Sequence, residues 1–284
     1  MAVTTVSSLN SLYNVLFEET WYVARQAAMM PNLVFRFQDG GLGAQARKVG
    51  EWGSITVNQV AEGVDAAGAS TFGKTLGATL TPNDAVGVAI LTDDMVNTDQ
   101  ENTVAALSFE MGNAIATAVD ESIVDLFPSF STDKGTGAGQ TATLASASAA
   151  ISILINNKAP GPFNFVLHPY QWHDIFKELG MPAATYSFLG DVANEALREY
   201  SVGQFVGARW FINSNIDVDG SDDAVGAVFS PRAIGYDPRG EPKYETERDA
   251  SLRATEYVVV HKYAVGILKN TWGVKYTSDA STPS

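Results

Sequence analysis

The strongest constraint in this sequence lies in residues 43–127, where an alternating hairpin leads directly into an unusually long helix. Apolar side chains recur at steps of three and four through residues 101–127, which predicts one helix with a single apolar stripe. Pro128 cannot continue the backbone hydrogen bonds, so the helix is expected to end just before it. At 1.5 Å per residue the helix would span roughly 40 Å, whereas a typical globular helix has about 11–12 residues. The stripe contains Leu107, Met111 and Ile115, and we expect it to face a sheet formed partly by residues 257–260.

The hairpin is predicted from two alternating segments, residues 51–62 and 73–91, which both have the pattern of strands. The tip between them, GVDAAGAST, has no large side chain with which to pack. Neither the hairpin nor the helix is expected to bury its apolar surface in a compact monomer, so the subunit is predicted to complete its core against copies of itself. A flexible surface hairpin is the alternative. The residues expected to contact other subunits are Trp52, Ile55, Val57, Val60, Lys74, Leu76 and Leu80.

Composition narrows the class of protein. The 284 residues suffice for one large domain or two moderate ones, and no run of about 18 apolar residues predicts a membrane span. The N-terminus lacks the basic start and small-residue cleavage site of a secretory signal. Cysteine is absent, which excludes disulfides and thiolate chemistry. The net charge of −14 repels phosphate backbones and argues against nucleic-acid binding, although a charge of this size can also serve solubility alone.

The rest of the chain alternates helices and strands without repeats, as expected for an α+β protein. An amphipathic segment, LYNVLFEETWYVARQAA, is followed by a short strand and turn in NLVFRFQDGG. Further helices are expected at residues 143–157, 170–179 and 190–200, and further strands at residues 163–167, 206–216, 224–231 and through much of 244–278.

No group of residues has the spacing of a known reaction centre, so the chain is predicted not to be an enzyme and to have no cofactor or metal. His168, His173 and His261 do not form a ligand motif, and no phosphate-binding glycine loop or nucleophile elbow occurs. Residues 215–220 resemble the start of a calcium loop, but the twelfth position is Gly226 where a glutamate is required. Asp93 and Asp94 are expected on opposite faces of a strand, which excludes a catalytic pair.

The order of these pieces, together with several phrases, resembles the major capsid proteins of tailed bacteriophages (the Hong Kong phage coat fold). NFVLHPYQWHDIFKEL resembles the axial-domain strand and helix of that family, VGARWFINSNI and AVGAVFSPRAIGY the next two strands, and ERDASLRATEYVVVHKYAVGILKNTWGVKYT the return to the peripheral domain. The resemblance implies the following division of the chain: an N-terminal arm at 1–42, an extended loop at 43–86, a peripheral domain at 87–142 with a spine helix at 98–127, an axial domain at 143–235, a return at 236–278, and a disordered tail at 279–284.

The same resemblance implies a structural subunit that assembles as hexamers and pentamers into an icosahedral shell around double-stranded viral DNA. The expected partners are further copies of the chain, a separate scaffolding protein, a portal protein and decoration proteins. DNA is expected to be enclosed without sequence-specific binding, and no membrane is expected. The expected location is the virion, after assembly in the host cytoplasm. A bacterial nanocompartment shell protein and a non-viral α+β binding or catalytic domain are the alternatives.

Overall fold

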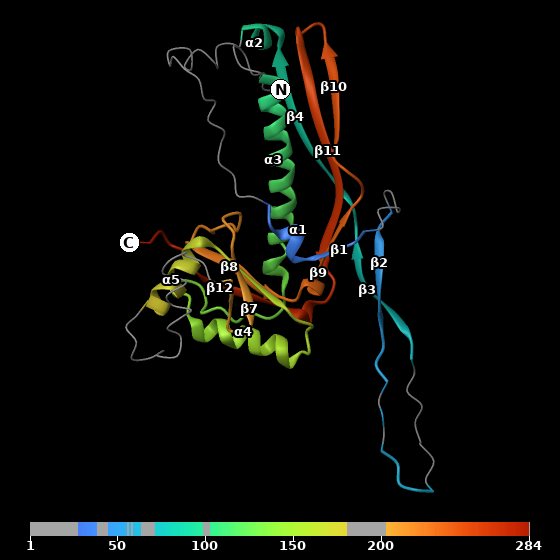
Figure 1. Ribbon diagram of the computed structural model, residues 1–284, viewed down its shortest axis with the longest axis vertical. Coiled ribbons are helices and arrows are strands. Elements are labelled where there is room, and N and C mark those ends of the chain that lie inside the picture. The colour runs from blue at the N-terminus through green and yellow to red at the C-terminus, as the bar shows by residue number, and fades with distance from the viewer. Residues whose placement is uncertain are drawn as a thin grey trace.

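The computed structural model describes residues 28–38, 45–55, 57, 59–63, 72–98, 103–180 and 203–283. Figure 1 shows a tall unit built around α3, a lower unit that contains α4 and α5, and a two-stranded hairpin that leads away from both. The predictions for residues 1–27, for the tip at 64–71 and for a helix at 190–200 fall outside the described residues.

The tall unit packs one long helix, α3 (Thr103–Val124), on a five-stranded sheet. In this sheet β1, β9, β11 and β10 lie side by side and β4 also pairs with β11; every pairing is antiparallel except that of β1 with β9. Met111 and Ile115 are buried against Val259 of β11, with Leu107 and Tyr257 packed at the edge. The predicted inward face of the helix is therefore confirmed. The strands are β1 (Phe35–Arg36), β4 (Asn83–Thr92), β9 (Ile234–Pro238), β10 (Lys243–Asp249) and β11 (Ala254–Ile267).

The lower unit is a second five-stranded sheet, in the order β12-β8-β5-β7-β6, packed against α4 (Leu144–Asn156) and α5 (Pro169–Gly180). Thr143 caps α4 because its hydroxyl oxygen accepts a hydrogen bond from the Ser146 amide at 3.3 Å. The core is strongly aromatic, with Phe165 and Trp210 stacked at 4.3 Å between ring centroids. The strands are β5 (Phe163–Leu167), β6 (Gln204–Phe205), β7 (Ala208–Ile212), β8 (Asp223–Phe229) and β12 (Gly273–Asp279).

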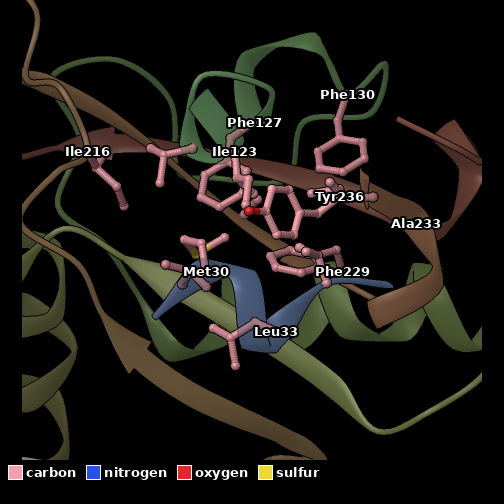
Figure 2. Packing of buried hydrophobic residues seen from close by; sticks show 14 of the residues in the cluster. Met30, Leu33, Ile123, Phe127, Phe130, Ile216, Phe229, Ala233 and Tyr236 are labelled. Atoms are coloured by element: carbon pink, nitrogen blue, oxygen red, sulfur yellow. The ribbon is translucent and has the colours of Figure 1, made fainter. Parts of the chain in front are cut away.

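A central apolar cluster joins the two units (Figure 2). It contains side chains from the short helix α1 (Met30–Leu33), from the end of α3, and from β8 and β9. Met30, Ile123, Phe127 and Phe229 are all fully buried there. Three one-turn 3₁₀ helices complete the described structure: η2 (Phe127–Ser129), η4 (Pro231–Ala233) and η5 (Asn270–Trp272).

Several boundaries differ from those predicted. The expected strand at 73–91 is two strands, β3 (Lys74–Leu80) and β4, because the chain leaves its partner at Pro82, which has no N–H to donate. Residues 93–98 form a separate short helix, α2 (Asp93–Thr98), although Asp93 and Asp94 were expected on a strand and the long helix was expected from residue 98 onward. At the C-terminus, β12 extends to Asp279 and the amide of the buried Ala280 donates to the Asp222 carbonyl at 2.7 Å. The chain is therefore ordered past the expected start of the tail.

Candidate inter-subunit interface

The hairpin pairs β2 (Arg47–Trp52) with β3 in an antiparallel ladder that runs from Arg47 opposite Leu80 to Trp52 opposite Lys74, with an irregularity between Lys48 and Gly50. β2 therefore begins four residues before the strand predicted at 51–62. The two strands form a sheet of their own, and Figure 1 shows the ribbon beyond them pointing away from the body. A side chain on this hairpin therefore reaches the protein core only near its base.

An aromatic pair lies near the outer end of the ladder. The rings of Trp52 and Phe72 stack with 5.2 Å between centroids and an interplanar angle of 5°, and the Lys74 ammonium lies 5.6 Å from the Trp52 ring centroid. Trp52 is 61% exposed and Phe72 is exposed as well, so stacking leaves much of their apolar surface in water. The sequence reasoning missed Phe72. The feature that could have identified Phe72 is its position just after the small-residue tip, which allows it to lie across from Trp52.

Apart from Leu80, all the other predicted contact residues are also exposed, Lys74 among them. Val57 is 88% exposed, and Ile55, Val60 and Leu76 are exposed as well. Isolated exposed apolar residues are ordinary on protein surfaces, but here several of them, including two aromatic rings, lie together on one projecting hairpin. This surface, made of Trp52, Ile55, Val57, Val60, Phe72 and Leu76, is called the hairpin surface below.

Leu80 differs from the other predicted contact residues, because it is 1% exposed and packs within its own subunit. It lies against Gly266 of β11, where a Cβ atom would stand 2.6 Å from the Leu80 Cδ2. Only a glycine fits so close a neighbour without a shift of one of them. Leu80 is therefore a core residue that attaches the hairpin, and it does not belong to the hairpin surface.

A buried charge cluster also attaches the base of the hairpin. The Arg47 guanidinium donates to Asp237 from Nε at 2.9 Å, and Nη2 of Arg239 lies 2.7 Å from the same carboxylate. The Asp237 and Arg239 side chains are fully buried, and Arg47 is nearly so. A buried carboxylate between two guanidinium groups ties the first residue of β2 to the end of β9. Further out, Lys269 pairs with Glu51.

A second exposed apolar strip lies on the body of the subunit. Ala85, Ala89 and Val259 face α3, so alternation along the strands places Val86 and Val88 on the opposite face of the sheet. Both valines are exposed, and their cross-strand partners are Val260 and Val258. The next strand places Lys243 and Glu245 beside these partners. This valine strip, residues 86, 88, 258 and 260, was not predicted from the sequence.

The three histidines lie at separate positions along the chain, and two of them are buried in the fold. His168 is buried, its Nδ1 accepts from the Tyr170 amide at 3.3 Å, and burial lowers its pKa. His261 is buried with its Nε2 at 3.3 Å from the Tyr236 hydroxyl. Burial lowers the pKa of His261, with a smaller lowering from Arg36 and an opposing effect of Glu241. His173 lies on α5, next to Asp174.

The acidic candidates are engaged in local structure. In the turn that resembled a calcium loop, one oxygen of Asp219 accepts from the amides of Ser221 and Asp223 at 2.8 and 3.0 Å. Asp93 lies in the first turn of α2, rather than on the expected strand, and forms two hydrogen bonds with Arg248 at 2.9 and 2.7 Å. Among the described residues no three histidine or acidic side chains are grouped as metal ligands, and no helix has the length and apolarity to cross a bilayer.

The family model described as phage capsid protein matches residues 87–276, which is most of the chain. The chain belongs to the phage capsid protein family. The predicted resemblance is thereby confirmed, as is the role of a major capsid structural protein, and neither the nanocompartment nor the non-viral alternative is favoured. No curated protein sequence matches the chain.

Solved structures agree with this fold. A chain of Mycobacterium phage Che8 superposes with a TM-score of 0.71 at 20% identity, over 92% of this chain and 96% of that chain. The capsid of Cyanophage P-SCSP1u gives a TM-score of 0.72 at 14% identity, over 96% and 95%. The acidic stable capsid of Helicobacter pylori bacteriophage KHP30 gives 0.70 at 12% identity, over 99% and 100%. The predicted α+β capsid fold is confirmed.

Proposed function

We propose that this capsid protein assembles as hexamers and pentamers into an icosahedral shell that encloses double-stranded viral DNA, and that the hairpin surface makes the contact between neighbouring subunits. The single observation that carries the proposal is the exposed, partly aromatic hairpin, anchored at its base by Leu80 and Arg47 and unsupported by the cores of either unit. An isolated two-stranded hairpin is marginally stable in water, so burial against a second copy is its natural source of stability.

The valine strip is the surface of the neighbour that suits the hairpin best. It offers exposed aliphatic side chains, with acidic groups close by at Glu245 and Glu256. The described hairpin carries exposed ammonium groups at Lys48 and Lys74, which can meet these carboxylates on a neighbouring subunit. Apolar contact surrounded by opposite charges gives both affinity and a defined orientation.

The domain assignments follow the family architecture. In this proposal residues 1–42 form the N-terminal arm, 43–86 the extended loop, 87–142 and 236–278 the peripheral domain, and 143–235 the axial domain. The observed α3 is the spine helix of the peripheral domain. The unit that contains α4 and α5 supplies most of the axial domain, although β12 of its sheet comes from the returning segment.

The remaining partners are those of a phage head. We propose a separate scaffolding protein, a portal protein and decoration proteins, with the subunit located in the virion after assembly in the host cytoplasm. The negative charge of the chain suits a wall that holds DNA without adhering to it. The role is structural rather than enzymatic, with no cofactor.

Electron microscopy of the purified protein, with and without its scaffold, tests this proposal. The expected result is closed shells, or hexamers and pentamers, and shells from infected cells should contain DNA that nuclease cannot reach. A protein that stays monomeric at high concentration in every salt and scaffold condition would contradict it. Shells that hold an enzyme cargo and no nucleic acid would favour the nanocompartment instead.

A further inference from the structure

Asp120 lies in the buried face of α3 and accepts four hydrogen bonds. It is fully buried. Its Oδ1 accepts from the backbone amides of Met29 and Met30, both at 2.8 Å. Its Oδ2 accepts from the side-chain amides of Asn213 and Asn215, at 2.6 and 3.0 Å. A buried carboxylate needs this many donors to replace its lost hydration.

These four bonds join three segments that are far apart in the sequence. Met29 and Met30 start α1, Asp120 belongs to α3, and Asn213 directly follows β7 of the second sheet. The Asn213 amide donates to the Leu167 carbonyl at 2.9 Å, so this residue is also fixed to the end of β5. One side chain of the tall unit therefore holds both α1 and the edge of the lower unit.

The other end of α1 is held in a matching way. The buried Asn164 of β5 donates to the Leu33 carbonyl at 2.8 Å, while its own oxygen accepts from Arg209 at 2.8 Å. Between these two attachments Met30 and Leu33 lie in the central cluster, between α3 and the strands of the lower sheet (Figure 2). α1 is thus a wedge between the two units, with a polar attachment at each end.

We infer that Asp120 is a positioning residue: with the α1 wedge it fixes the angle between the α3 unit and the sheet of the lower unit. Apolar packing alone tolerates small sliding, whereas four short hydrogen bonds to one carboxylate specify a single arrangement. If the proposed shell is correct, this angle sets the curvature of each subunit in the wall, so its loss should broaden the distribution of shell diameters. That consequence rests on the proposed function, whereas the junction itself can be tested in the subunit alone.

The test uses a reciprocal exchange. Asp120→Asn turns one acceptor into a donor that faces the Asn213 amide, and Asn213 cannot turn over because its oxygen accepts from the Asn215 amide at 2.8 Å. Asn213→Asp instead places two carboxylates face to face. The double variant restores a donor against an acceptor between positions 120 and 213, and the remaining side-chain oxygen at position 120 still faces Met29 and Met30. Asn215, whose Nδ2 donates to the replaced oxygen, must turn its amide over to present its own oxygen to the new donor. Val119→Ala, at a buried neighbouring position of α3, is the control for a simple loss of packing.

Hydrogen exchange of residues 28–36 and 211–217 is the deciding measurement, with the midpoint of thermal unfolding measured in parallel. Each single variant should exchange on the order of tenfold faster in both segments, beyond any change in Val119→Ala at matched stability, and the double variant should recover most of the protection. Equal exchange in Asp120→Asn and Val119→Ala, or additive losses in the double variant, would overturn the inference.

If Asp120→Asn fails to fold, Asn215→Ala provides the milder test, because it removes only the 3.0 Å donor. It should still raise exchange in residues 28–36, which it does not directly contact through that bond, and unchanged exchange there would overturn the inference. Shell diameters measured by electron microscopy then separate the two levels. Altered protection with shells of unchanged size would refute the link to curvature, while the absence of shells even from the unaltered protein would refute the proposed function.

Discussion

The β2–β3 hairpin and the β10–β11 pair are both antiparallel, yet they are stabilised in different ways. β11 has β4 on its other side and α3 across one face, so Val259 is fully buried. β2 and β3 pair only with each other in the described structure, and Leu76 remains exposed halfway along the strand. The same local geometry thus gives a self-sufficient core element in one place and an element that needs a neighbour in the other. Substitutions in the two regions can break or sharpen this comparison.

The largest effect is expected from Met111→Asp, on the face of α3 that packs against β11. The substitution would bury an unpaired charge beside Ile115 and Val259 and should cost at least about 3 kcal/mol. Little soluble protein should be recovered, as measured by expression and circular dichroism. Phe109→Asp, on an exposed position of the same helix, is the control and should stay folded. A soluble, assembling Met111→Asp protein would mean that the helix buries another face.

Leu80→Ala should destabilise the subunit by about 2–5 kcal/mol, because it opens a cavity against Gly266. Leu76→Ala, in the same strand, should change the free energy of unfolding by less than about 0.5 kcal/mol, because its side chain already faces water. Urea unfolding of the two variants measures the contrast. Similar losses in both would show that the hairpin is supported along its whole length by its own subunit.

Acidification is expected to lower the stability of the subunit by a smaller amount. This effect arises from His261 in β11, in the body of the subunit, and not from the hairpin. Burial lowers the pKa of His261 below its unfolded value of about 6.5, so the unfolded state takes up the proton more readily and stability falls as the pH drops below about 6.5. The raised pKa values of Asp125 and Asp174, caused by burial, act in the opposite direction.

Comparing the unaltered protein with His261→Gln isolates the histidine, because both carry the same aspartates. Urea unfolding at pH 7.5 and 5.5 should show a smaller pH-dependent loss in the variant. An identical pH dependence would mean that His261 is not desolvated in the folded subunit.

Trp52→Ala, like Leu76→Ala, is expected to have only a small effect on the subunit. The exposed stack with Phe72 should contribute less than about 1 kcal/mol, in the range of a cross-strand pair. Thermal unfolding of the unassembled subunit should therefore be almost unchanged. A large fall in its melting temperature would place Trp52 in the subunit's own core and contradict its assignment to the hairpin surface.

Periodicity predicted the elements whose burial is uniform along their length. The predicted buried strand FNFVL matches β5 from end to end, and it is buried along its whole length. The apolar stripe of the long helix packs against β11, as predicted. The pattern of β3 was harder to interpret, because Leu76 and Leu80 alternate on one face but only Leu80 reaches the body. The alternation of side chains along a strand shows which residues share a face. It does not show how much of that face the rest of the subunit covers.

The contacts that attach the hairpin and α1 to the rest of the subunit could not be predicted from the sequence, for a different reason. Arg47 meets Asp237 across 190 residues, and Asp120 meets Met30 across 90 and Asn213 across 93. No local spacing predicts such pairs, because the two folded units bring them together. The valine strip was missed similarly, since only the position of α3 decides which face of β4 stays exposed.

The central claim is that the hairpin surface serves assembly and not the folding of its own subunit. Serine at Trp52, Ile55 and Leu76 together tests it, with Phe, Val and Ile at the same positions as the apolar control, by electron microscopy and light scattering under assembly conditions. The account predicts that the serine variant has the melting temperature of the unaltered subunit and forms no shells, while the apolar control assembles. Normal shells from the serine variant would contradict it.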